Sequence, residues 1–170
     1  MTATIPDLWS EEIKVDVLTP LAILRTQEGF LERRTQGTLR ALVSSNESAS
    51  WVRHQLDLIA PALDGYRTTL LTAKHHIDSV YPVIVRSRVF LPAHSPQQIL
   101  EGDPDLLPDE KEAITQDEFI ELVRKVLHSR HVLSLTQSLI ARSNEMRNQG
   151  QGREAGKPNA QNESNKANGE

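Results

Sequence analysis

The stretch "YRTTLLTAKHHIDSVYPVIVRSRVFL", residues 66–91, decides the fold of this chain. Its two outer parts, residues 66–73 and 80–91, are rich in threonine, valine, isoleucine and aromatic residues, which favour β-strands. Between them lie Asp78 and Ser79, whose side chains form hydrogen bonds with the local backbone in turns. The pattern predicts two antiparallel strands joined by a loop of about five residues.

The preceding segment, "WVRHQLDLIAP" at residues 51–61, can be interpreted in two ways. Its residues alternate between two faces, as in a strand, but they also fit a helical stripe within residues 48–64. Pro61 disfavours a long helix, and Ser-Asn and Asp-Gly turn signals recur at strand-like spacing. We therefore predict strands here and in the weakly alternating residues 38–45, which gives a meander of three to four strands.

Helices are predicted on both sides of this meander. Thr19 can cap a helix that begins at Pro20 and ends near Gly37. The sequence "TQDE", residues 115–118, has the spacing of a capping box. A second C-terminal helix is expected to start at Ser129.

These elements predict one α+β domain over residues 1–145. It has an N-terminal helix, an antiparallel meander and two C-terminal helices. The alternative is a mostly helical fold with one β-hairpin. Residues 92–114 are rich in proline and acids and form a long connection. Residues 146–170 are almost free of apolar side chains, so a disordered polar tail is expected.

Composition limits the function classes. The chain of 170 residues has 19 basic and 23 acidic residues and a net charge of −4, which disfavours broad attraction to nucleic acids. It has no cysteine, so disulfides and thiolate metal sites are excluded. No apolar run approaches the ~20 residues that span a bilayer, and the N-terminus lacks a secretory signal. We expect a cytoplasmic protein that does not enter membranes.

Two histidine groups are candidates for a metal site: His75 and His76 with Asp78, and His128 with His131. A metal needs ligands that converge within roughly 2.0–2.2 Å of one ion. Neighbours on a strand point to opposite faces, so the first group is interpreted as a turn. The second group is interpreted as a solvent-facing pair near a helix end. No metal and no other cofactor is expected.

Three arginines form a candidate binding patch. Arg86 and Arg88 share one face of the predicted strand, and Arg67 lies on the strand before it. Together they could hold a carboxylate or a phosphate.

His54 alternates with apolar neighbours, so we predict that it is buried in the sheet and hydrogen-bonded.

The chain has no glycine-rich phosphate loop, no GxSxG elbow and no series of zinc ligands. We expect no catalytic residues. The predicted function is a non-catalytic protein that binds a protein partner or itself. The first alternative is a metal-dependent hydrolase that uses the histidine groups. The second is a nucleic-acid accessory protein that uses the arginines.

Overall fold

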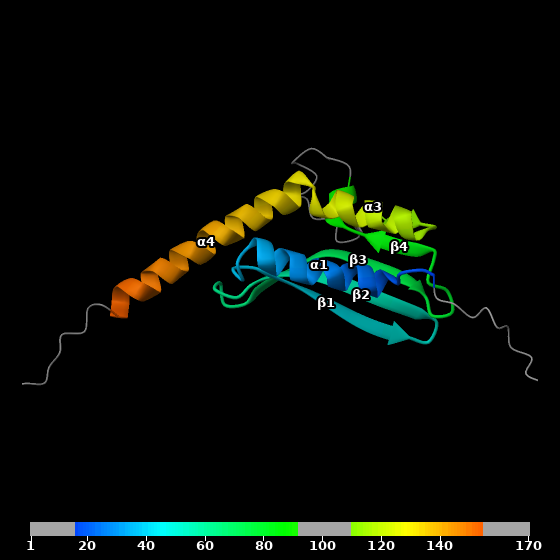
Figure 1. Cartoon of the computed structure of the whole chain (residues 1–170), viewed down its shortest axis with the longest axis horizontal. Helices are drawn as coiled ribbons and strands as arrows, with labels where there is room; N and C mark the ends of the chain where they lie inside the picture. The colour runs from blue at the N-terminus through cyan, green and yellow to red at the C-terminus, as the bar shows by residue number, and fades with distance from the viewer. Residues whose placement is uncertain (1–15, 92–109, 155–170) are drawn as a thin grey trace, which may run out of the picture.

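The computed structural model describes residues 16–91 and 110–154 of the chain, and within these ranges it has an α+β fold (Figure 1). The elements in chain order are α1 (Pro20–Arg34), β1 (Arg40–Ser48), β2 (Trp51–Ala60), β3 (Tyr66–His76), β4 (Val83–Arg86), the 3-10 helix η1 (Arg88–Phe90), β5 (Glu110–Ala113), α3 (Gln116–Leu127) and α4 (Arg130–Glu154). The predicted fold class is confirmed. The mostly helical alternative is wrong, because residues 51–60 form a strand.

The five strands form one sheet in the order β1-β2-β3-β4-β5, and all neighbours are antiparallel. The core lies against one face of the long central strands, where Leu56, Leu58 and Leu71 are each only 1% exposed. The pairing of β2 with β3 shifts between Leu56 and Asp57. This irregularity leaves Leu70 as an extra residue in β3.

The Asp-Gly signal marks a tight turn between β2 and β3. Asp64 and Gly65 both have positive φ angles, 52° and 70°, as a type I′ turn requires. The Ser-Asn signal is not a turn. Ser45 and Asn46 pair with residues of β2, and the chain reverses at residues 49–50 instead.

The strand predicted to run to residue 91 is shorter. Ser87 explains this, because its hydroxyl donates a hydrogen bond to the Leu70 carbonyl (2.7 Å) and accepts one from the Val89 N–H (3.3 Å). These bonds turn the chain into η1 and place Phe90 in the core, where it is 7% exposed. Arg88 therefore lies on η1 and not on the predicted strand.

The sheet also contains β5, which the pattern of the sequence does not predict. Its four residues include a single buried side chain, Ala113, which pairs with Val83.

The predicted starts of the helices are confirmed. Thr19 Oγ1 accepts a hydrogen bond from the Ala22 N–H (3.2 Å), and Thr115 caps α3 in the same way.

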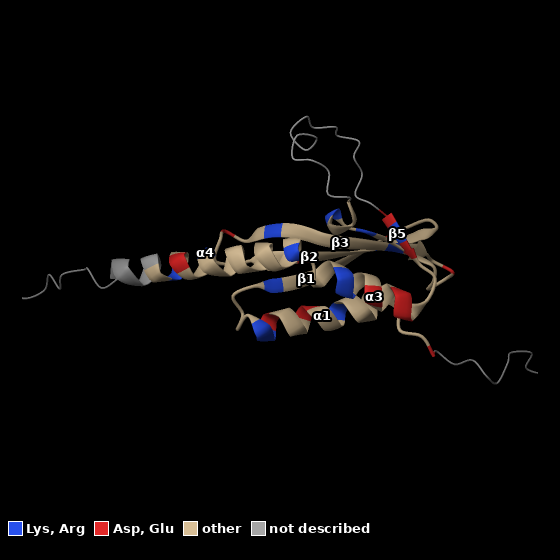
Figure 2. Ribbon diagram, turned by 90° about the horizontal axis from the view of Figure 1, so that it is seen from above, with Lys and Arg blue, Asp and Glu red and all other residues tan. Residues whose placement is uncertain are grey.

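The helices α1 and α3 lie on the same side of the sheet (Figure 2). Their buried residues, Leu24 of α1 and Phe119 of α3, are each 0% exposed and belong to the core. No α-helix of residues 16–91 and 110–154 covers the opposite side, although Arg88 of the 3-10 helix η1 lines a hollow there. That side is called the open face below.

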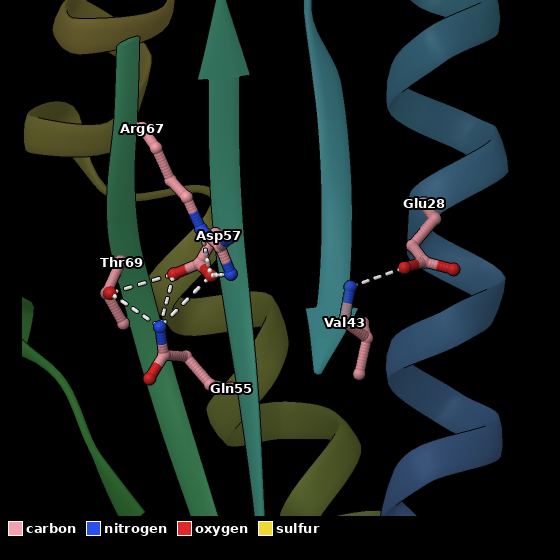
Figure 3. Close-up of polar contacts among 6 residues, drawn as sticks. All are labelled: Glu28, Val43, Gln55, Asp57, Arg67 and Thr69. Atoms are coloured by element: carbon pink, nitrogen blue, oxygen red, sulfur yellow. Dashed lines mark hydrogen bonds and ion pairs between the residues drawn. The ribbon is translucent and has the colours of Figure 1, made fainter. Parts of the chain in front are cut away.

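A side chain of α1 binds a backbone group at the outer edge of β1. The Glu28 carboxylate accepts a hydrogen bond from the Val43 N–H, at the middle of this edge strand (Figure 3). Charges placed at an edge oppose pairing with a further strand. Glu28 therefore opposes growth of the sheet at β1.

The last helix, α4, starts where expected, because Ser129 Oγ accepts a hydrogen bond from the Val132 N–H (3.2 Å). It extends past Met146 to Glu154 and so continues the fold beyond residue 145. The rest of the predicted tail, residues 155–170, lies outside the described residues, as does most of the connection at 92–114. No helix in the described ranges is both long and apolar enough to cross a membrane.

Ser143 on α4 provides a stability test. It is 0% exposed, and its hydroxyl has no hydrogen-bond partner among the described residues. An unsatisfied buried hydroxyl costs about 1–3 kcal/mol, so Ser143→Ala should raise the free energy of unfolding by about 1 kcal/mol. Ser138→Ala, on the exposed side of the same helix, should change it by less than about 0.5 kcal/mol. Chemical denaturation of both variants measures the difference, and equal effects would contradict the prediction.

Candidate functional site

The open face carries polar side chains that the strand register aligns in rows. One row contains Asn46, Arg53, Lys74, Ile84 and Glu112. The next contains Ser44, Gln55, Thr72, Arg86 and Glu110. Basic residues therefore lie on the middle strands, and the acids lie on β5 at one edge (Figure 2).

Arg53 and Lys74 are directly opposite each other on neighbouring strands. Like charges in this position destabilise a sheet. Within the described ranges, no carboxylate lies within ion-pair distance of Arg53. The repulsion between the two charges is therefore not offset by an ion pair of Arg53 within the described residues, and an anion bound over the pair would relieve it.

Trp51 lies beside this pair and is partly exposed. The Lys74 ammonium lies 4.0 Å from the centre of the Trp51 ring, which is a cation–π contact. The His76 ring lies at a centroid distance of 4.1 Å. Trp51 also lines three shallow hollows of the open face, with volumes of ≈ 580, 500 and 370 Å³. An aromatic side chain thus lies where these hollows adjoin.

The predicted arginine patch is only partly assembled. Arg86 and Arg88 line the largest hollow together, although Arg86 is paired with Glu110. Arg67 is not among the residues that line it. Its guanidinium pairs with Asp57, farther along β2 (Figure 3).

The Asp57 carboxylate is the centre of a polar cluster at the irregular pairing of β2 with β3. Its side chain is 0% exposed. It accepts hydrogen bonds from Arg67 Nε (2.8 Å), Thr69 Oγ1 (2.8 Å) and Gln55 Nε2 (2.9 Å) (Figure 3). The carboxylate is satisfied by these donors, so the cluster is best explained as structural.

A buried histidine pair lies on the helix-covered face. His54 of β2 and His75 of β3 are 3% and 9% exposed, and their Nε2 atoms are 3.2 Å apart. His54 Nδ1 lies 2.8 Å from Ser45 Oγ. His75 Nδ1 lies 2.8 Å from the His76 carbonyl oxygen and 3.0 Å from that of Ser79. The predicted burial and hydrogen bonding of His54 are confirmed.

The partners determine where the ring protons lie. His75 Nδ1 faces two carbonyl oxygens and must carry a proton, so in the neutral ring its Nε2 is an acceptor. His54 Nε2 then donates to His75, and His54 Nδ1 accepts from the Ser45 hydroxyl. Burial, together with the neighbouring His75 and Arg25, lowers the pKa of His54 from 6.5 to about 4. The His54 ring is therefore neutral at pH 7.

The other residues considered as metal ligands, His76, Asp78, His128 and His131, are distributed over the surface. His76 lies on the open face, and its Nδ1 atom is 3.5 Å from Oδ1 of the exposed Asp78. His128 is the C-cap of α3, and His131 lies in the first turn of α4. Within the described residues, no group of three or more histidines and carboxylates could hold a metal ion.

No sequence pattern singles out Trp51 or predicts the contact between His54 and His75. Alternation indicated the burial of His54, but the contact depends on the register of two strands. Comparison of the chain with protein-family models, with curated proteins and with solved structures gives no match.

Proposed function

We propose that this protein is a non-catalytic binding protein whose open face holds an acidic, extended segment of a protein partner. The observation that carries the proposal is the Arg53–Lys74 pair beside Trp51. Carboxylates of the partner would lie over the two cations, and an apolar side chain would pack on the indole ring. The cytoplasmic location expected from the sequence is part of the same proposal.

A protein segment fits this surface better than a nucleic acid does. Proteins that bind single strands use several aromatic side chains and a continuous basic groove. Here Trp51 is the aromatic residue that adjoins all three hollows, and Glu110 and Glu112 limit the basic area at β5. Self-assembly through the edge of β1 is disfavoured by Glu28, which already occupies the Val43 N–H.

Trp51 makes the proposal directly measurable. The chain has two tryptophans, and Trp9→Phe leaves Trp51 as the sole source of indole fluorescence. The probe is a synthetic peptide in which glutamate alternates with leucine. It should change the fluorescence saturably, and the affinity should fall with added salt because exposed charges are screened.

Reversing the charges of Arg53 and Lys74 tests whether this pair binds the acidic peptide. Each exposed ion pair contributes on the order of 1 kcal/mol, so Arg53→Glu with Lys74→Glu should weaken binding at least about tenfold. Arg142→Glu, on the exposed side of α4, is the matched control and should bind like the parent. A control peptide has lysine in place of each glutamate. The absence of a saturable response, or an equal response to this control peptide, would overturn the proposal. Tighter binding of oligothymidylate would favour the nucleic-acid alternative instead.

A further inference from the structure

The buried histidine pair directs one ring nitrogen of each residue toward the other. The two Nε2 atoms face each other at 3.2 Å, with the ring centres 5.3 Å apart. Both nitrogens therefore lie between the rings. The Nδ1 atom of each ring is held by oxygen, Ser45 Oγ for His54 and two backbone carbonyls for His75. Metal-bound histidines are oriented by such contacts at the nitrogen that does not bind the metal.

We propose that His54 and His75 form a two-coordinate site for a soft monovalent metal ion of the Cu(I) class. The ion would lie between the two Nε2 atoms, in place of the shared proton. This site lies on the helix-covered side of the sheet and is independent of the binding surface around Trp51.

Binding of the ion between the two rings requires only that protons move within the pair. The proton on His54 Nε2 moves to His54 Nδ1, and the Ser45 hydroxyl turns from donor to acceptor. His75 keeps its Nδ1 proton and its two carbonyl partners. Each imidazole stays neutral and offers one lone pair to the ion, so no proton is released on binding.

The distance allows this ion with a small adjustment. Metal–imidazole bonds of first-row metals are roughly 2 Å long, so the two nitrogens must separate from 3.2 Å to about 4 Å. His75 is the last but one residue of β3, next to the turn that leads to β4. A shift of less than about 1 Å in this ring opens the required space.

The ligand set selects the class of ion. Zinc takes four ligands and calcium six to eight, whereas no third histidine or carboxylate joins the pair within the described residues. Imidazole is a good ligand for copper, and Cu(I) is stable with two nitrogen ligands. Burial and the nearby Arg25, which oppose positive charge on His54, also favour the ion of lowest charge.

The test uses the full chain under anaerobic, reducing conditions, with Cu(I) itself as the probe. Competition with a chromogenic Cu(I) chelator should reveal one tightly bound equivalent. His54→Gln and His75→Gln should each weaken binding by more than tenfold, and Ser45→Ala by about tenfold. His76→Gln removes the exposed neighbour of His75 and should leave the affinity unchanged.

A second measurement does not depend on how well the variants fold. In the unaltered chain, Cu(I) should shift the Nε2 resonances of His54 and His75 in imidazole ¹⁵N spectra, and Zn(II) should not. The proposal is overturned if the chain holds no Cu(I) against the chelator. It is also overturned if His76→Gln weakens binding as much as His75→Gln, or if other histidines give the shifted resonances.

Discussion

Replacing Arg67, whose side chain is 46% exposed, with methionine is expected to lower the free energy of unfolding by about 2 kcal/mol. The Asp57 carboxylate is fully buried, and the Arg67 guanidinium is its ion-pair partner. Methionine preserves part of the aliphatic stem but leaves the buried charge with neutral donors only. Urea unfolding followed by circular dichroism measures the change, provided that the slope with urea is the same in both proteins.

Arg86→Met is the matched control for this prediction. Arg86 and its partner Glu110 are 40% and 42% exposed, so this pair should contribute at most about 1 kcal/mol. Adding Asp57→Asn to Arg67→Met should recover part of the lost stability, because the buried charge is then removed. If Arg67→Met costs no more than Arg86→Met, the cluster around Asp57 does not hold the sheet in the way that its geometry indicates.

Acidification is expected to destabilise the fold through His54. Its pKa falls from 6.5 in the unfolded chain to about 4 in the folded protein, chiefly because of burial. Between these values the unfolded state binds the proton and the folded state does not. The stabilisation is therefore fully present above pH 6.5 and is lost as the pH falls towards 4. The shift corresponds to about 3 kcal/mol at most.

The contribution of His54 can be separated from that of the carboxylates by substitution. In His54→Gln the slope of stability against pH should be much flatter between pH 4 and 6.5, although the protein is less stable at pH 7. His131→Gln, which alters an exposed histidine, should retain the slope of the parent protein. Thermal unfolding at a series of pH values measures both. Equal slopes in all three proteins would show that His54 is not the titrating group.

The parts of the fold that could be predicted are those that local chemistry decides. The Thr19-Pro20 pair and the capping threonine at 115 begin helices through contacts within one turn. Pro61 correctly excluded a long helix in the region that became β2. The Asp-Gly pair at residues 64–65 marked its turn because only that kind of sequence readily accepts two positive φ angles.

The parts that were missed depend on distant partners. The strand β5 reads "EKEA" and has almost no apolar pattern, because it is a short edge strand that gains its structure from pairing with β4. Arg88 lies on η1 and not on a strand because of Ser87, whose hydroxyl donates a hydrogen bond to the Leu70 carbonyl on another strand.

Dependence on distant partners also explains why the contacts of the candidate sites could not be predicted from the sequence. Alternation placed His75 and His76 on opposite faces, but it could not show that His75 meets His54, 21 positions earlier. Likewise, the importance of Trp51 depends on Lys74 and His76 from the neighbouring strand. These contacts follow from the register of β2 with β3, which no single segment of the sequence specifies.

The contact between Glu28 and the Val43 N–H has a consequence for the state of the whole protein in solution. An incoming backbone that tried to pair with β1 would meet a carboxylate where it needs a donor. The first helix therefore acts as a built-in inhibitor of polymerisation as well as a cover for the core. A chain that lacks the residues before Thr35 would expose both the core and the edge of β1, and pairing between chains at that edge would be favoured.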